Sequence, residues 1–155
     1  MDAKLVNPFI DAFISVMPQI GFPIPKRTKV YLQSKNINNF GVVVMIGFTK
    51  QIRGNVVYNM SEDTAKFIAS TMMMGMPVAE FDAMAQSAIA EMSNMLAANT
   101  ATNLTALELE VDISTPSLTI GADSQIKISD SQYLTIEMDL GGHKVDIAIA
   151  VDRDL

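Results

Sequence analysis

The sequence predicts a single α+β domain over residues 1–155, in which long helices pack on a largely antiparallel sheet. Segments with apolar residues at helical spacing alternate along the chain with short runs rich in β-branched residues. Two pairs of these runs are joined by hairpin turns, which make neighbouring strands antiparallel. The 155 residues are 49% hydrophobic and 18% charged, so the chain is long and apolar enough to bury one core.

The first helix is predicted to begin at Asn7 and Pro8, with Asn7 as its N-cap and Pro8 at the first helical position. Apolar residues then recur at helical spacing, and the helix is expected to end near Pro18 or Gly21. Residues 21–26 include two prolines and are predicted to form a rigid extended connector.

Strands and a second helix follow in the first half of the chain. The predicted strands are residues 29–33, 42–48 and 55–60. A turn at residues 49–54 would join the last two as a hairpin. The tripeptide SED at residues 61–63 is expected to cap a second helix over residues 64–74, which Gly75 ends.

The second half repeats this plan of a helix followed by strands and a final hairpin. Pro77 precedes a long third helix, predicted over residues 81–103. The predicted strands after it are residues 109–114, 125–129, 133–140 and 144–151. Gly141 and Gly142 mark the tight turn of the last hairpin. The two halves therefore show a weak internal repeat.

The third helix carries the residues with the clearest chemical potential. At about 100° per residue, Ser87, Glu91 and Asn94 lie on one stripe. The predicted core face lies beside it and consists of Phe81, Met84, Ala85, Ala88, Ile89, Met92, Met95 and Leu96. The neighbours of the stripe are alanines, so a partner backbone could approach Glu91 and Asn94 closely. The alternative interpretation is an ordinary solvated helix surface, because Ala and Glu are good helix formers.

The spacing along this stripe resembles the signature of the CheC/CheX/FliY family of bacterial chemotaxis phosphatases. In that family Asp or Ser is followed after three residues by Glu, after two more by Asn, and later by Pro. Here the pattern reads Ser87, Glu91, Asn94 and Pro116. The segments ANTATNLTAL and ISTPSLTIG, and the opening NPFIDAFISVM, which is typical of CheX, extend the resemblance over most of the chain.

The resemblance implies a CheC-like fold, a duplication of helix-plus-strand units with exchanged strands. It also implies a substrate, the aspartyl phosphate of a CheY-like response regulator of two-component signalling. By resemblance, Asn94 orients the attacking water and Glu91 pairs with a lysine of the regulator. The phosphoacceptor and Mg²⁺ belong to the regulator, so no cofactor or metal site is expected in this chain. The chemistry agrees, because an amide has no ionisable proton but can orient a water molecule.

One active stripe is expected, although CheC members carry the signature in both halves. In the first half, Asp11, Ser15 and Pro18 stand at the matching positions, so the Glu and the Asn are missing. This is the CheX pattern, and since CheX relatives form dimers through their strands, a homodimer is expected. A non-catalytic adapter or assembly domain remains the alternative function, because the same fold serves in flagellar-switch proteins.

Composition excludes several other classes of protein. The net charge is −6 and the 11 Lys and Arg residues are scattered, so no nucleic-acid partner is expected. The longest apolar run, residues 42–48, is too short for a membrane span, and Asp2 and Asp11 argue against a secretory signal. The chain has no cysteine, which excludes disulfides and thiolate chemistry and agrees with a cytoplasmic location.

The remaining candidate residues are expected to be structural. His143, the only histidine, is predicted to be a surface turn residue rather than a catalytic base. The methionine-rich run at residues 72–76 is predicted to be core and helix end, with an adaptable partner surface as the alternative. Asn99, Thr102 and Asn103 are expected on the core-facing arc, where they would tie the helix end to the following loop and strand.

Overall fold

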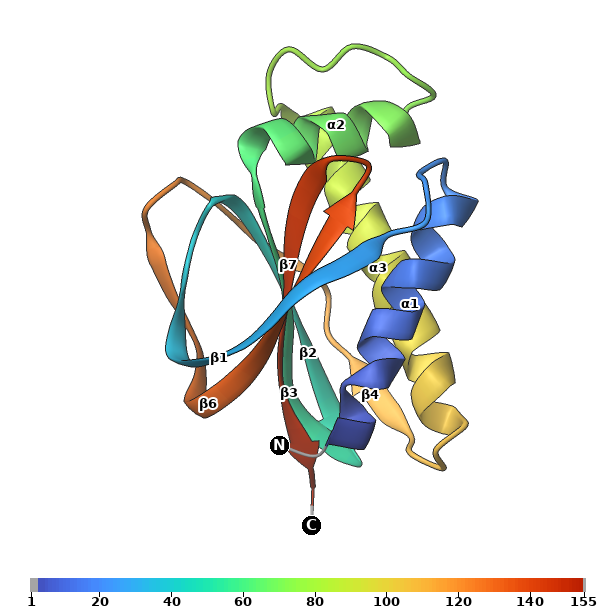
Figure 1. The fold of residues 1–155 in the computed structure, drawn as a ribbon, viewed down its shortest axis with the longest axis vertical. Coiled ribbons are helices and arrows are strands. Elements are labelled where there is room, and N and C mark those ends of the chain that lie inside the picture. Colours follow the sequence, from blue (N-terminus) through green and yellow to red (C-terminus); the bar gives the residue numbers. More distant parts are fainter. Residues whose placement is uncertain (1–2, 155) are drawn as a thin grey trace.

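The computed structural model describes residues 3–154, which form three α-helices, one short 3-10 helix and a seven-stranded antiparallel sheet (Figure 1). The helices are η1 (Ala3–Leu5), α1 (Asn7–Gln19), α2 (Glu62–Met72) and α3 (Ala83–Thr105). The strands are β1 (Lys26–Asn38), β2 (Gly41–Lys50), β3 (Ile52–Ser61), β4 (Val111–Ile113), β5 (Ser117–Ile120), β6 (Gln125–Leu140) and β7 (His143–Arg153). The predicted α+β class is confirmed.

The order of strands, β1-β6-β7-β3-β2-β4, shows that the two halves of the chain exchange strands. The hairpins β2–β3 and β6–β7 meet where β3 pairs with β7. On the outer side of each hairpin lies a strand from the other half, β1 beside β6 and both β4 and β5 beside β2. The duplicated fold with exchanged strands is therefore present, and each half completes the sheet of the other.

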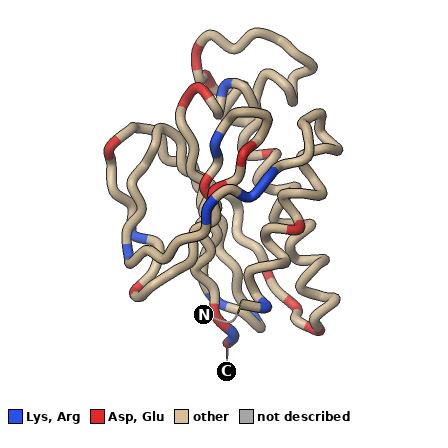
Figure 2. The backbone as a smooth tube through the Cα atoms, in the orientation of Figure 1, with Lys and Arg blue, Asp and Glu red and all other residues tan. Residues whose placement is uncertain are grey.

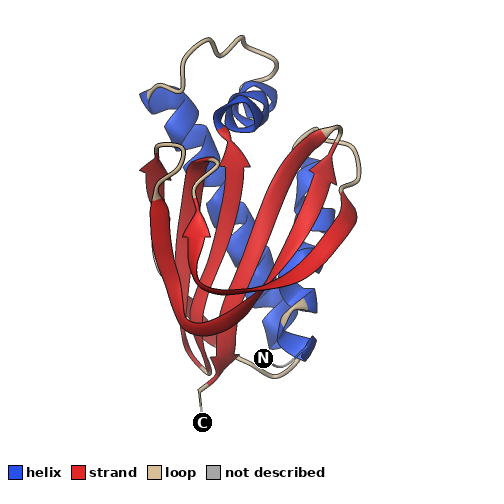
Figure 3. Cartoon of the chain, turned by 60° about the vertical axis from the view of Figure 1, so that its left-hand side comes forward, coloured by secondary structure: helices blue, strands red, loops and turns tan. Residues whose placement is uncertain are grey.

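All three α-helices cover one face of the sheet, and the main core lies between these two layers (Figure 3). Alternation along β7 places Val145, Ile147 and Ile149 in this core. The helices α1 and α3 lie against each other, whereas α2 crosses one end of the layer (Figure 1). The rings of Phe9 in α1 and Phe48 in β2 meet edge to face, with 5.2 Å between their centroids.

A smaller core lies on the opposite face of the sheet. There the C-terminal half of β1 and the N-terminal half of β6 curve over the central strands (Figure 3). Its buried members are Ile37, Val43, Val57, Ile128, Tyr133 and Ala148. The two separate strands predicted at residues 125–129 and 133–140 are one continuous strand, β6. The polar segment between them reads as a loop in sequence, but β1 pairs with β6 on both sides of it, at Lys127 and at Gln132, across an irregularity in the register.

The ends of the helices differ in how well local sequence predicts them. Ser61 caps α2 as expected, and its Oγ accepts a hydrogen bond from the amide of Thr64 at 3.1 Å. The predicted cap at Asn7 is wrong, because Asn7 is already helical and Val6 is the N-cap, without a side-chain bond. The preceding turn η1 brings the chain into α1 without an Asn cap, whereas Pro8 does lie in the first turn.

Pro116, the last residue of the signature, lies at the break between β4 and β5. Both short strands pair with β2, and a proline has no amide to donate to the ladder between them. The strand predicted at residues 109–114 is the three-residue β4, and β5 was not predicted. Its four residues are too short and too exposed to show strand periodicity.

Gly54 should be required for the pairing of β3 with β7. Its φ is +140°, and a Cβ at this position would lie 1.9 Å from the carbonyl oxygen of Ala150. We expect Gly54→Ala to lower the free energy of unfolding by about 3 kcal/mol, measured by urea denaturation. Gly47→Ala in β2 is the control, because its nearest contact would be an ordinary 3.4 Å to Ser114. Equal stabilities of the two variants would contradict the close approach.

Candidate functional site

The helix α3 is fixed at its start and along its inner side. Asp82 is its N-cap, and the Asp82 Oδ1 accepts a hydrogen bond from the amide of Ala85 at 3.0 Å. Ile89, Met92 and Leu96 are completely buried on the inner side, as the predicted core face requires. The helix begins two residues later and ends two residues later than the predicted range of 81–103. Its outer side is therefore held on a well-packed base.

Glu91 and Asn94 are exposed on the outer side of α3, as predicted, and Ser87 is exposed one turn before Glu91. Among residues 3–154, the side chains of Glu91 and Asn94 make no hydrogen bond or ion pair. The two positions are three residues apart, so their side chains leave the helix from neighbouring points of one stripe. The carboxylate and the amide are thus both available to a partner.

Small residues flank this pair, and no basic residue lies near it in sequence. Ala83 and Ala98 are exposed on the same side of α3, so few long side chains would hold a partner away. No Lys or Arg occurs between Lys66 and Lys127, a stretch that contains all of α3 (Figure 2). Glu91 therefore lies in a region without basic neighbours in sequence, which favours a partner that brings its own cation.

The predicted core face of α3 is partly wrong. Met84 was expected in the core but is 63% exposed, whereas Ala88 and Met95 are half-buried and pack against the core. Ser93 and Thr100 are also buried, and their hydroxyls donate to the carbonyl four residues earlier at 2.9 and 2.8 Å. These internal bonds satisfy the hydroxyls, so small polar side chains can occupy the packed face.

The polar residues near the end of α3 bind a different element from the one expected. The Asn103 Nδ2 donates to the main-chain oxygen of Pro8 in α1 at 3.0 Å, and lies 3.4 Å from the Asn99 Oδ1. Asn103 thus ties α3 to α1 rather than to the following loop and strand. Thr102 was placed on the core-facing arc but is exposed.

Two further expectations change with the structure. His143 is the first residue of β7, and its ring stacks on Phe67 of α2 with 3.9 Å between centroids, so it contributes packing that a surface turn residue would not. In the methionine-rich run, Met74 is 97% exposed and Met76 is 58% exposed. The core interpretation is wrong for these two residues, whereas Met73 is half-buried.

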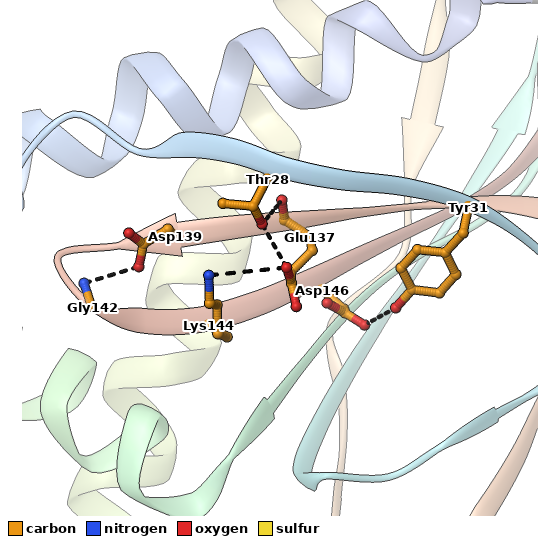
Figure 4. A network of polar contacts seen from close by, with 7 residues as sticks. All are labelled: Thr28, Tyr31, Glu137, Asp139, Gly142, Lys144 and Asp146. Atoms are coloured by element: carbon orange, nitrogen blue, oxygen red, sulfur yellow. Dashed lines mark hydrogen bonds and ion pairs between the residues drawn. The ribbon is translucent and has the colours of Figure 1, made fainter.

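A polar network that sequence reasoning missed lies on strands β1, β6 and β7 (Figure 4). Asp146 is 5% exposed and accepts a hydrogen bond from the hydroxyl of Tyr31. Nearby, the Thr28 Oγ1 donates to the Glu137 Oε2 at 2.6 Å, and Lys144 lies 3.9 Å from the same oxygen. The sequence does contain one signal for this network. Asp146 lies between two apolar residues of an alternating strand, so its side chain points to the face of the sheet opposite to the main core.

Burial raises the pKa of the Asp146 carboxyl, and the charge of Glu137 raises it further, while the bond from Tyr31 acts in the opposite direction. Burial beside Asp146 likewise raises the pKa of Tyr31. Within residues 3–154 there is no group of three or more His, Cys, Asp or Glu residues that could hold a metal ion. In the same range, none of the helices is long and apolar enough to span a membrane.

The exchanged sheet with its helical layer on one face defines the class of CheC-like proteins. A CheC-like superfamily protein from Shewanella sp. PV-4 has the same fold, with a TM-score of 0.87, 23% identity, and coverage of 98% of this chain and 99% of that one. Residues 42–139 match the family model described as chemotaxis phosphatase CheX. The chain belongs to the CheX family.

Two relatives carry more sequence similarity. The CheY-P phosphatase CheX of Thermotoga maritima is 35% identical over 127 residues, which cover 82% of each chain. The CheX of a CheX–CheY–BeF₃–Mg²⁺ complex from Borrelia burgdorferi is 27% identical, with a TM-score of 0.78 and coverage of 95% of this chain and 97% of that one. Both matches cover most of this chain.

The raised pKa of Asp146 predicts a specific dependence of stability on pH. The folded protein holds the proton on this carboxyl more tightly than the unfolded chain, so stability falls as the pH rises from about 4 through the raised pKa. Asp146→Asn removes this titration. We expect the variant to gain stability relative to the wild type over this range, measured by urea denaturation at several pH values. A difference that stays constant with pH would contradict the burial of a charged carboxylate.

Proposed function

We propose that this protein hydrolyses the aspartyl phosphate of a CheY-like response regulator, with Asn94 and Glu91 as its catalytic residues. The observation that carries the proposal is the exposed and unpaired pair of side chains on α3 of a CheX-family domain. The activity named for the Thermotoga maritima relative supports the reaction. The CheY and Mg²⁺ of the Borrelia burgdorferi complex support the partner and the place of the metal.

Asn94 acts by orienting water. Its amide offers an oxygen that accepts a hydrogen bond and an NH₂ group that donates, so it can hold a water molecule in line with the phosphorus–oxygen bond. The water oxygen attacks phosphorus, the bond to the aspartyl oxygen breaks, and the carboxylate leaves without a proton. Inorganic phosphate is the other product. Positioning supplies much of the catalysis in such a transfer, and the regulator's Mg²⁺ stabilises the charge on the phosphoryl oxygens.

Glu91 acts by binding a cation of the regulator. Its carboxylate is exposed and unpaired in the free protein, so no existing ion pair must break when the partner arrives. The attraction steers the partner towards Glu91 and should weaken as salt screens it. The pair then fixes the regulator so that Asn94 enters its active site. This protein contributes no cofactor of its own, and both partners act in the cytoplasm.

Replacing the two residues should produce different defects. Asn94→Ala should lower turnover of the phosphorylated regulator by about 100-fold with little loss of binding. The reason is that the contact between Asn94 and the attacking water stabilises mainly the transition state. Glu91→Ala should weaken binding by about tenfold and make it less sensitive to salt. The measurement is loss of phosphate from the regulator as its concentration is varied. Neither change should alter the free energy of unfolding by more than about 0.5 kcal/mol.

The matched control is Thr102→Ala, because Thr102 is exposed on the same side of α3, beyond the pair. Its turnover and affinity should equal those of the wild type. Wild-type turnover by Asn94→Ala would exclude Asn94 as the water-orienting residue. Regulator binding without any hydrolysis by the wild-type protein would favour the adapter function.

We also propose that the protein forms a homodimer through the outer edge of β1. Among the described residues, β1 pairs with β6 on one side only, and Val30 and Leu32 are 51% and 63% exposed. Leu32 also lines an apolar hollow of about 390 Å³ beside Val6 and Leu134. A free edge with apolar side chains is suited to pairing with a second strand, and a second copy would supply one.

The dimer should depend on the apolar side chains of β1. Leu32→Lys is expected to shift the protein to a monomer in sedimentation velocity experiments, because it places a charge at the proposed contact. The control is Ile120→Lys in the exposed strand β5, near the edge of the sheet opposite to β1. This change should leave the sedimentation coefficient unchanged. A wild-type protein that sediments as a monomer at all concentrations would rule the dimer out.

A further inference from the structure

We propose that exposed methionines at the start of α3 form a second docking area for the regulator, next to the Glu91 and Asn94 pair. This methionine surface consists of Met76, in the segment between α2 and α3, and Met84, in the first turn of α3. It would bind an apolar patch beside the regulator's phosphorylation site. The inference rests on the proposed function and adds a binding determinant to it.

The methionine surface is continuous with the proposed catalytic pair. Met84 precedes Glu91 by seven residues, which is two helical turns, so both side chains leave the same side of α3. The distance along the axis is about 10.5 Å. A partner that covers about 800 Å², the usual area on one side of a protein interface, extends about 16 Å from its centre. A regulator centred on Glu91 therefore reaches Met84.

The surface has a shape that can receive side chains. Met76 and Met84 line one shallow hollow of about 410 Å³, together with Met73, Pro77 and Val78. Met76 is 58% exposed and Met84 is 63% exposed, so their apolar area faces solvent in the free protein. Exposed apolar area of this kind is unfavourable unless a partner covers it. Methionine side chains are flexible and polarisable, which suits them to a contact that forms and breaks.

The charges around the hollow indicate the chemistry of the partner. Glu80 and Asp82 line it together with the methionines, and no basic residue occurs between Lys66 and Lys127. Glu80 and Asp82 therefore add two carboxylates to the side of α3 that carries Glu91. The expected partner surface is therefore apolar at its centre and basic at its margin. A regulator that presents a cation to Glu91 would have to carry this apolar patch on the same face.

The test is the double variant Met76→Gln/Met84→Gln. Glutamine has nearly the same length as methionine and is a good helix former, so circular dichroism should show an unchanged fold. The probe is the cognate regulator activated with BeF₃ and Mg²⁺, which reports binding without hydrolysis. We expect its dissociation constant to rise about tenfold or more. With the phosphorylated regulator, KM should rise by the same factor while kcat stays unchanged.

The matched control is Leu107→Gln, which makes the same kind of change at a 41% exposed residue just beyond the opposite end of α3. Its affinity should remain that of the wild type. An unchanged affinity in the double variant, with turnover still dependent on Asn94, would overturn this inference and leave the proposed function standing. A changed sedimentation coefficient of the free double variant with unchanged affinity would assign the surface to self-association and also overturn it.

Failure of the proposed function gives a different pattern. If the wild type binds the activated regulator but releases no phosphate, the phosphatase function fails, and the affinity of the double variant still decides the inference. If the wild type does not bind the activated regulator, both proposals are wrong.

Discussion

Burial of the inner side of α3 is the constraint on which the rest of this structure depends. Ile89, Met92 and Leu96 are fully enclosed between the sheet and the neighbouring helix, and Asn103 fixes the far end of α3 to α1. Because the helix cannot turn about its axis without exposing this side, the direction of Glu91 and Asn94 is set by packing. A partner then meets side chains on a rigid base, and little backbone entropy is lost when it binds.

The sequence predicts correctly those features that depend only on residues close together in the chain. The cap at Ser61, the Gly141–Gly142 hairpin turn and the exposed pair on α3 are of this kind. The errors arise where a distant segment decides. β1 pairs with β6 on both sides of its polar middle and so makes one strand of a stretch whose residues favour a loop. On α3, Ser93 and Thr100 are buried because their hydroxyls bond within the helix, whereas Met84 is exposed. Hydrophobicity alone therefore predicts the wrong limits for the core face of this helix.

The duplicated architecture makes α1 and α3 comparable, yet only α3 carries the proposed catalytic residues. At the positions that match the stripe, α1 has Asp11 and Ser15, which are exposed, and Pro18, which is half-buried in the last turn. A proline cannot replace the hydrogen-bonding amide of Asn94 in the second half. The first half thus serves the second as support, through its packing against α3, and the divergence leaves a single proposed active side on a duplicated frame.

The exchange of strands also determines when this protein can fold during its synthesis. The bond between Thr28 and Glu137 joins residues 109 positions apart, and β1 has no partner until β6 leaves the ribosome. Until then the nascent first half exposes an unpaired strand and the outer edge of β2, which are surfaces that favour aggregation. Neither half can form the complete sheet alone, so the native state forms only after β6 and β7 have been synthesised, and the early chain is a natural client for chaperones.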